Sequence, residues 1–247
     1  MSPHRLGAVL IVCLLVAGCV GSSGSPTPPG ITDEGVTDTT ALIEAHTEAL
    51  ESTSFTVTAT RTMRGTDPEF AVTTNRTWQI NRGSSIRGYS VQTTTVSGAA
   101  PQQYAVIPTV ETYRNGTTTV ERRTTTNGSN IRAVDLLNSS VRLNSALHRP
   151  LLYELTTHEN VTVDTVSRDG AELYRLSAAL NDTGIRSNAS MTLFVTTEGV
   201  VRELRSTRTV RYRSGPREIT QRVQFSDIGR TAVDHPSWMA ASENKSR

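Results

Sequence analysis

Residues that could carry out chemistry are few and widely spaced in this chain of 247 residues. Beyond the first ten residues the histidines are His46, His148, His158 and His235, and none belongs to an HExxH motif or a Cys/His cluster of the kind that binds zinc. A GxSxG motif is also absent, and nucleophilic catalysis needs a Ser or Cys held beside a His and a carboxylate. We therefore expect no catalytic residue, no metal site and no enzymatic activity.

Cysteine occurs only near the N-terminus, at Cys13 and Cys19. Arg5 precedes an almost wholly apolar run over residues 6–17, which is the layout of a signal peptide. A helix of that length would reach about 18 Å, well short of the ~30 Å hydrocarbon layer of a membrane. The sequence thus predicts a signal peptide over residues 1–18 in place of a transmembrane helix, with a buried N-terminal helix as the alternative.

The segment LVAGC, Leu15–Cys19, resembles the lipobox of secreted lipoproteins. The resemblance implies cleavage before Cys19 and a thioether between its sulfur and a lipid, with no other cofactor. Two hydrocarbon chains are enough to hold a protein on a membrane. The implied location is therefore the extracellular face of the cell membrane, with the protein anchored by its lipid. Because Cys13 leaves with the signal peptide, the mature chain would contain no internal disulfide.

Composition and charge set the remaining organisation. Residues 19–35 are rich in Gly, Ser and Pro, which predicts a lipidated cysteine followed by a flexible tether. We expect a single domain over residues 36–240 and a disordered tail over residues 241–247. The 25 Lys and Arg residues nearly balance the 23 Asp and Glu residues, which argues against nucleic acid as a partner. We expect the protein to be a monomer.

Hydropathy periodicity predicts one helix followed by many strands. The helix has Thr37 or Asp38 as its N-cap, followed by apolar residues at the 3.6-residue period. From Phe55 to Met63 the period becomes two, as in a half-buried strand. Further strands are predicted over residues 70–80, 85–95, 103–107, 110–114, 117–124, 161–167, 171–180, 189–197, 200–213 and 217–227. Helical spacing recurs over residues 130–155 until Arg149-Pro150 breaks it, which predicts a helix or a pair of helices between the two runs of strands.

This order of elements predicts an α+β fold, because so many antiparallel strands tend to curl. We expect a large curved half-barrel of about 10 or 11 strands, with an N-terminal helix and a helical insert on its concave side. The order resembles the half-barrel carriers of the LolA, LppX and LprG type. The segments AHTEALESTSFTVTATRT, SRDGAELYRL and FSDIGRTAVDHPSWMA are similar to an uncharacterised lipoprotein family of halophilic archaea. That resemblance implies an archaeal source.

Two functions fit this arrangement. The first is a non-enzymatic carrier in which the sheet and the helical insert enclose a cavity for a lipid or another hydrophobic ligand. The residues expected to line that cavity are Phe55, Val57, Leu137, Leu193, Val195, Leu204 and Phe225. The alternative is that these residues form an ordinary core and that the protein is a ligand-free structural or sensor-partner protein of the cell envelope.

Three further patterns carry specific expectations. Within residues 200–213, alternation places Arg202 and Arg208 on the face of Leu204; they either form cross-strand ion pairs or meet lipid phosphates at a cavity mouth. Asn115 and Asn127 are glycosylation candidates because each lies in a predicted turn and matches the acceptor pattern. Trp238 is expected to close the domain by packing its indole on the sheet edge.

Overall fold

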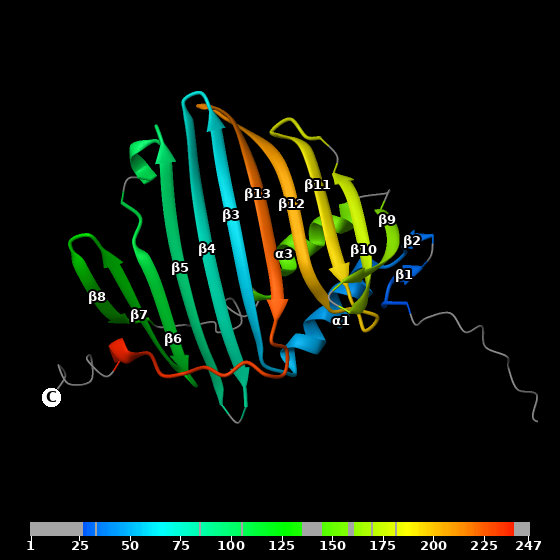
Figure 1. Cartoon of the computed structure of the whole chain (residues 1–247), viewed down its shortest axis with the longest axis horizontal. Coiled ribbons are helices and arrows are strands. Elements are labelled where there is room, and N and C mark those ends of the chain that lie inside the picture. The colour runs from blue at the N-terminus through cyan, green and yellow to red at the C-terminus, as the bar shows by residue number, and fades with distance from the viewer. Residues whose placement is uncertain are drawn as a thin grey trace, which may run out of the picture.

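The computed structural model describes residues 27–32, 34–83, 85–104, 106–134, 145–157, 161–168, 170–180 and 182–239. Its main element is an eleven-stranded antiparallel sheet in the order β8-β7-β6-β5-β4-β3-β13-β12-β11-β10-β9, which is not closed (Figure 1). The strands are β3 Phe55–Thr66, β4 Glu69–Arg82, β5 Ile86–Gly98, β6 Thr109–Asn115, β7 Thr118–Thr125, β8 Gly128–Ala133, β9 Val161–Arg168, β10 Ala171–Leu180, β11 Arg186–Val195, β12 Val201–Tyr212 and β13 Gly215–Ser226. This architecture confirms the predicted α+β half-barrel.

The sheet consists of two antiparallel meanders that meet at its centre. Strands β3 to β8 form one meander and β9 to β13 the other, and the pairing of β3 with β13 joins them. That pairing brings Val57 opposite Phe225, so residues near the two ends of the folded region stabilise each other directly. The free edges are β8 and β9, and both belong to the middle of the sequence.

The helices lie on one face of the sheet, called here the helix face; the opposite side is the outer face. Figure 1 shows α1 (Thr39–Glu51) and α3 (Arg149–Leu152) behind the strands. The 3-10 helix η2 (Tyr153–Thr157) directly follows α3, and η1 (Gln102–Tyr104) lies between β5 and β6. Strands β1 (Ile31–Thr32) and β2 (Gly35–Val36) form a small separate sheet within the segment predicted to be a tether.

Helix α1 begins as the sequence predicts. The Asp38 carboxylate accepts a hydrogen bond of 3.0 Å from the Ala41 N–H, which satisfies one of the free donors of the first turn. Its buried face includes Leu42, Ile43 and Leu50, each at most 1% exposed. These side chains belong to one hydrophobic core with the helix-face residues of β3, β4 and β9 to β13.

Two predicted elements differ in the structure. Gln103 and Tyr104 of the expected strand 103–107 belong to η1 instead. The helical insert is predicted from residue 130, but residues 128–133 form β8. Its described helical residues are 145–146, α3 and η2, which fits a pair of short helices. One helical segment ends at residue 146 and α3 begins at Arg149, so the helical pattern is interrupted next to Arg149-Pro150 as predicted. Pro150 lies in the first turn of α3, where a proline lacks only an N–H that would have no partner.

The C-terminal segment crosses the outer face of β3 to β7 (Figure 1). Trp238 is 6% exposed and packs with Tyr113, Val233 and Met239. Its indole N–H donates to the Glu111 carboxylate at 3.2 Å, and the Arg122 guanidinium lies over the ring. The indole therefore docks on the outer face of β6 and β7, not at the sheet edge.

Candidate functional site

The helix face divides into an apolar half and a polar half. On β9 to β13 the inward side chains are largely aliphatic, and α1, α3 and η2 cover them. On β5 to β7 the inward positions include Ser90, Thr112, Thr119 and Glu121, all buried. The apolar half is therefore the part of the sheet that could accommodate a hydrophobic ligand.

Six of the seven predicted cavity residues lie together in the core of this apolar half. Phe55, Val57, Leu193, Val195, Leu204 and Phe225 are each at most 3% exposed. They form one cluster with Leu147, Leu151, Leu152 and Leu155 of the insert. These are positions of an ordinary core, and the expectation that they line a ligand cavity stays a prediction. The seventh, Leu137, lies outside the described residues.

The cover formed by α3 and η2 is short. A four-residue helix cannot be stable alone, so this cover stays in place through the packing of its leucines against the sheet. His148, in the left-handed conformation at φ 52°, caps its start without a side-chain hydrogen bond to the backbone. The attachment of the cover to the sheet therefore depends on the burial of Leu151, Leu152 and Leu155.

Two histidines connect this cover to the core. The His46 ring of α1 accepts a hydrogen bond at Nδ1 from the Val201 N–H at 3.2 Å and meets Phe225 edge-on at 4.8 Å. His148 meets the Trp78 ring edge-on at 5.4 Å, and its Nε2 is buried without a hydrogen-bond partner among the described residues. His46 is fully buried.

Burial lowers the pKa of both histidines. For His46 burial lowers the pKa to about 4, with the nearby Leu147 carbonyl acting in the opposite direction and His148 in the same one. For His148 burial, followed by the positive charge of Arg76, lowers the pKa to about 4. Both rings are therefore neutral at pH 7, as their apolar surroundings require.

A polar margin borders the cover on the helix face of β11 and β12. Glu154 of η2 faces Arg186 at 3.4 Å and Arg208 at 3.3 Å. These distances exceed the 2.7 to 2.9 Å typical of a strong ion pair. The three side chains are between 22% and 26% exposed, so they are partly desolvated but reachable from solvent. The margin places two cations beside the apolar core with one carboxylate between them.

Sequence reasoning found only part of this margin. Arg208 shares a face with Leu204 as predicted, whereas Arg202 is exposed at an irregularity in the β11–β12 pairing that turns Val201 into the core. Arg186 and Glu154 were missed. They are 32 residues apart in the chain, and no local pattern connects them.

A groove of about 520 Å³ lies at the other end of β3, β4 and β5. Arg64 and Glu69 both line it, together with Phe70 and glycines at the strand ends. Because its charged lining residues are of opposite sign, this groove has no evident preference for a charged ligand.

The remaining predicted sites are exposed or lie outside the described residues. Asn115 and Asn127 are exposed at the ends of hairpins, as a glycan acceptor must be. Cys19 lies outside the described residues. Within the described ranges no helix has the length and apolar character needed to cross a membrane. In the same part of the chain no three His, Cys, Asp or Glu side chains gather as a metal site.

Comparison with known proteins gives likeness of fold only. No family model and no curated protein matches the chain. Among solved structures, one described as the complex structure of Pseudomonas aeruginosa MucA/MucB aligns with a TM-score of 0.37 and 13% identity over 82% of this chain, which spans 60% of the matched chain. A DUF1329 family protein from Desulfovibrio piger aligns with a TM-score of 0.27 and 12% identity over 83% of this chain and 96% of that chain.

A third similar structure is a putative outer membrane lipoprotein-sorting protein domain from Vibrio parahaemolyticus. It aligns with a TM-score of 0.26 and 9% identity over 83% of this chain and all of that domain. At these identities and TM-scores the likeness concerns the general arrangement of strands and says nothing of ligands.

Proposed function

We propose that this protein is a lipoprotein anchored through Cys19 outside the cell, and that its half-barrel is a non-enzymatic binding module for an anionic amphiphile. The ligand class is a hydrocarbon chain with one acidic head group. The observation that carries this proposal is the contact of Glu154 with Arg186 and Arg208 at the margin of the apolar core.

Glu154 occupies the position that a ligand's acid group would take. Its carboxylate lies between two guanidinium groups, which bind carboxylates and phosphates in the same geometry. Because the ion pairs are long, a free acid that approaches the two arginines more closely can replace Glu154. Displacement of η2 would then expose the leucine-rich surface beneath it to the ligand's hydrocarbon chain.

The apolar half of the helix face suits the hydrocarbon chain. Leu176, Leu193 and Leu204 lie on adjacent strands and are each at most 1% exposed. Leu152 and Leu155 of the insert cover these leucines. A bound hydrocarbon chain would therefore replace the aliphatic contacts of Leu152 and Leu155 with its own. Such an exchange conserves the buried apolar area.

We expect two opposite effects on binding of cis-parinaric acid, a fluorescent fatty acid, to the full chain at pH 7. Arg208→Gln should weaken binding roughly tenfold, about 1.4 kcal/mol, because one charge-assisted hydrogen bond is lost. Glu154→Gln should strengthen binding, because the internal competitor loses its charge. Arg211→Gln, on the outer face of the same strand, is the matched control and should leave binding unchanged.

The same binding experiment gives a different result if the polar margin has only a structural role. If Arg208 and Glu154 only stabilise the fold, both substitutions should change affinity in the same direction, or the fatty acid should not bind at all. The latter result would favour the second candidate, a ligand-free envelope or sensor-partner protein. That candidate is supported by the close packing of the six predicted cavity residues in the core.

Anchoring has a separate test. Cys19→Ser should move the protein from the membrane fraction to the soluble fraction of the producing cells, because no other residue can form the thioether. Mass spectrometry of the wild-type protein should show a lipid on the N-terminal cysteine. Recovery of the unmodified, uncleaved chain would contradict the anchor and leave the helix-face proposal intact.

A further inference from the structure

A second charged site lies on the outer face, separated from the helix face by the sheet itself. Glu203 of β12 is 3% exposed at its side chain and accepts hydrogen bonds of 2.6 Å from the Nε–H groups of Arg205 and Arg222. Arg168 of β9 reaches the other carboxylate oxygen at 2.6 Å. We call these four residues the Glu203 cluster.

The Glu203 cluster is held rigidly. Arg205 and Arg222 are directly opposite in the β12–β13 pairing, where like charges repel unless a carboxylate lies between them. The three short bonds to Glu203 fix each guanidinium from one side. Phe194 supports the arrangement from β11, because the guanidinium groups of Arg168 and Arg205 lie over its ring at 4.8 and 5.6 Å.

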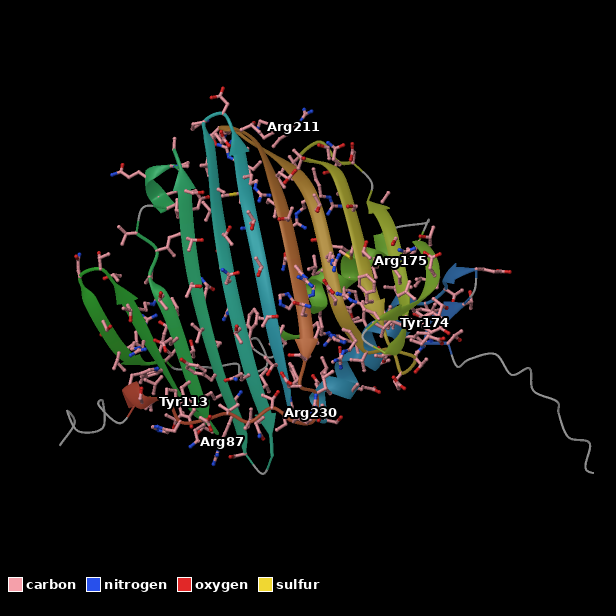
Figure 2. The ribbon with its side chains drawn as sticks, in the orientation of Figure 1. Arg87, Tyr113, Tyr174, Arg175, Arg211 and Arg230 are labelled. Carbon is pink, nitrogen blue, oxygen red and sulfur yellow. The ribbon has the colours of Figure 1, made fainter. Side chains whose placement is uncertain are left out.

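The Glu203 cluster has more positive charge than its own carboxylate neutralises. Three guanidinium groups against one carboxylate leave two positive charges. Other ion pairs of the outer face are matched one to one, as Arg175 with Asp164 and Arg64 with Glu218. Arg175 of β10 is labelled in Figure 2 and lies opposite Phe194 of the neighbouring strand β11. Among the described residues, no other carboxylate of the outer face pairs with three arginines.

Unused donors of the Glu203 cluster point to solvent. Arg205 and Arg222 are 50% and 48% exposed at their side chains. Each guanidinium has five N–H donors, and both residues use only Nε–H among the hydrogen bonds of the described residues. Their Nη groups are thus free to bind a second oxyanion. The net positive charge of the cluster favours an oxyanion such as a phosphate group.

We propose that Arg168, Arg205 and Arg222, oriented by Glu203, form a binding site for a phosphate-type oxyanion on the outer face. Phosphate oxygens accept the paired N–H groups of a guanidinium in a fixed geometry that a point charge such as lysine does not offer. The site does not depend on ligand binding at the helix face.

The position of the Glu203 cluster allows two sources of phosphate. Glu203 is two residues from Val201 in β12, and the Val201 N–H donates to His46 of α1. The turn before Val201 packs at Gly199 against Pro29, where the chain enters the fold. Ten residues of chain from Cys19 to Pro29 reach at most roughly 35 Å. If the proposed anchor holds, a phospholipid head group is therefore within reach. A soluble phosphate compound is the other source.

The experiment compares Arg222→Gln with Arg64→Gln in the full chain. Arg222→Gln leaves Glu203 with two arginine partners and so preserves the fold, while Arg64→Gln removes an exposed arginine at the far end of the outer face. Inorganic phosphate is titrated at constant ionic strength, and binding is followed by line broadening in phosphorus NMR. We expect wild type and Arg64→Gln to bind equally, and Arg222→Gln to bind roughly tenfold more weakly.

Vesicles then distinguish the sources. If the ligand is a membrane head group, Arg222→Gln also reduces co-sedimentation with phosphatidylcholine vesicles that contain phosphatidylglycerol, relative to Arg64→Gln. Unchanged co-sedimentation with weakened phosphate binding identifies a soluble phosphate and supports the site equally. Wild-type protein that does not bind phosphate, or equal binding by Arg222→Gln, overturns the proposal. These two overturning results do not test the lipid anchor at Cys19 or ligand binding at Arg208.

Discussion

Acidification from pH 7 to pH 4 should reduce the free energy of unfolding by about 3 kcal/mol for each of His46 and His148. Burial lowers the pKa of each ring to about 4 in the folded protein, against 6.5 in an unfolded chain. Between these values the unfolded state binds protons that the folded state does not, so stability falls as the pH falls. Below about pH 4 both states are protonated and this contribution is flat.

The measurement is urea denaturation at a series of pH values. The double substitution His46→Gln and His148→Gln should flatten the dependence between pH 6.5 and 4, even where the variant is less stable throughout. His235→Gln is the control, because His235 is exposed and lies in the C-terminal segment. A slope that persists in the double variant would show that other groups cause the acid sensitivity.

Trp238→Ala should lower the free energy of unfolding by about 3 kcal/mol, the usual loss when a buried indole is truncated. The substitution removes the ring from the cluster of Tyr113 and Val233 and takes one donor from Glu111. Tyr89 still donates to Glu111 at 2.6 Å. Burial, followed by that bond, raises the pKa of Tyr89 to about 12, so the phenol stays protonated.

Trp238→Phe separates the ring from its hydrogen bond. It keeps most of the aromatic contact and loses only the bond to Glu111, so we expect a loss of about 1 kcal/mol. Thermal unfolding of both variants tests the docking of the C-terminal segment. An alanine variant as stable as the phenylalanine variant would mean that the indole ring contributes nothing to stability.

Strands with regular alternation were predictable. Residues 171–180 form β10 as expected, because apolar and polar side chains alternate on two faces of one strand. β8 was missed, because five of its six residues are exposed and only Ile131 is partly buried, which leaves no alternation to detect. The position of Val201 in the core also escaped prediction, since an irregularity in the β11–β12 pairing interrupts the period of two.

The candidate site was less predictable than the sheet. Alternation assigned Arg208 to the correct face, but its partner Glu154 is 54 residues away and belongs to a 3-10 helix without a sequence signal. The burial of His148 could not be predicted either, because it depends on contact with Trp78 of β4, which is distant in the sequence. The Glu203 cluster combines residues of β9, β12 and β13, and one sequence does not show that such residues meet.

The most direct test of the proposed function uses the two tryptophans of the chain as separate reporters. Trp78 lies in the core beneath His148, whereas Trp238 lies on the outer face. A brominated stearic acid quenches tryptophan fluorescence only at short range. In the Trp238→Phe variant the bound acid should quench Trp78, and in the Trp78→Phe variant it should leave Trp238 unquenched. Equal quenching of the two tryptophans, or none of Trp78, would contradict binding of an amphiphile at the helix face.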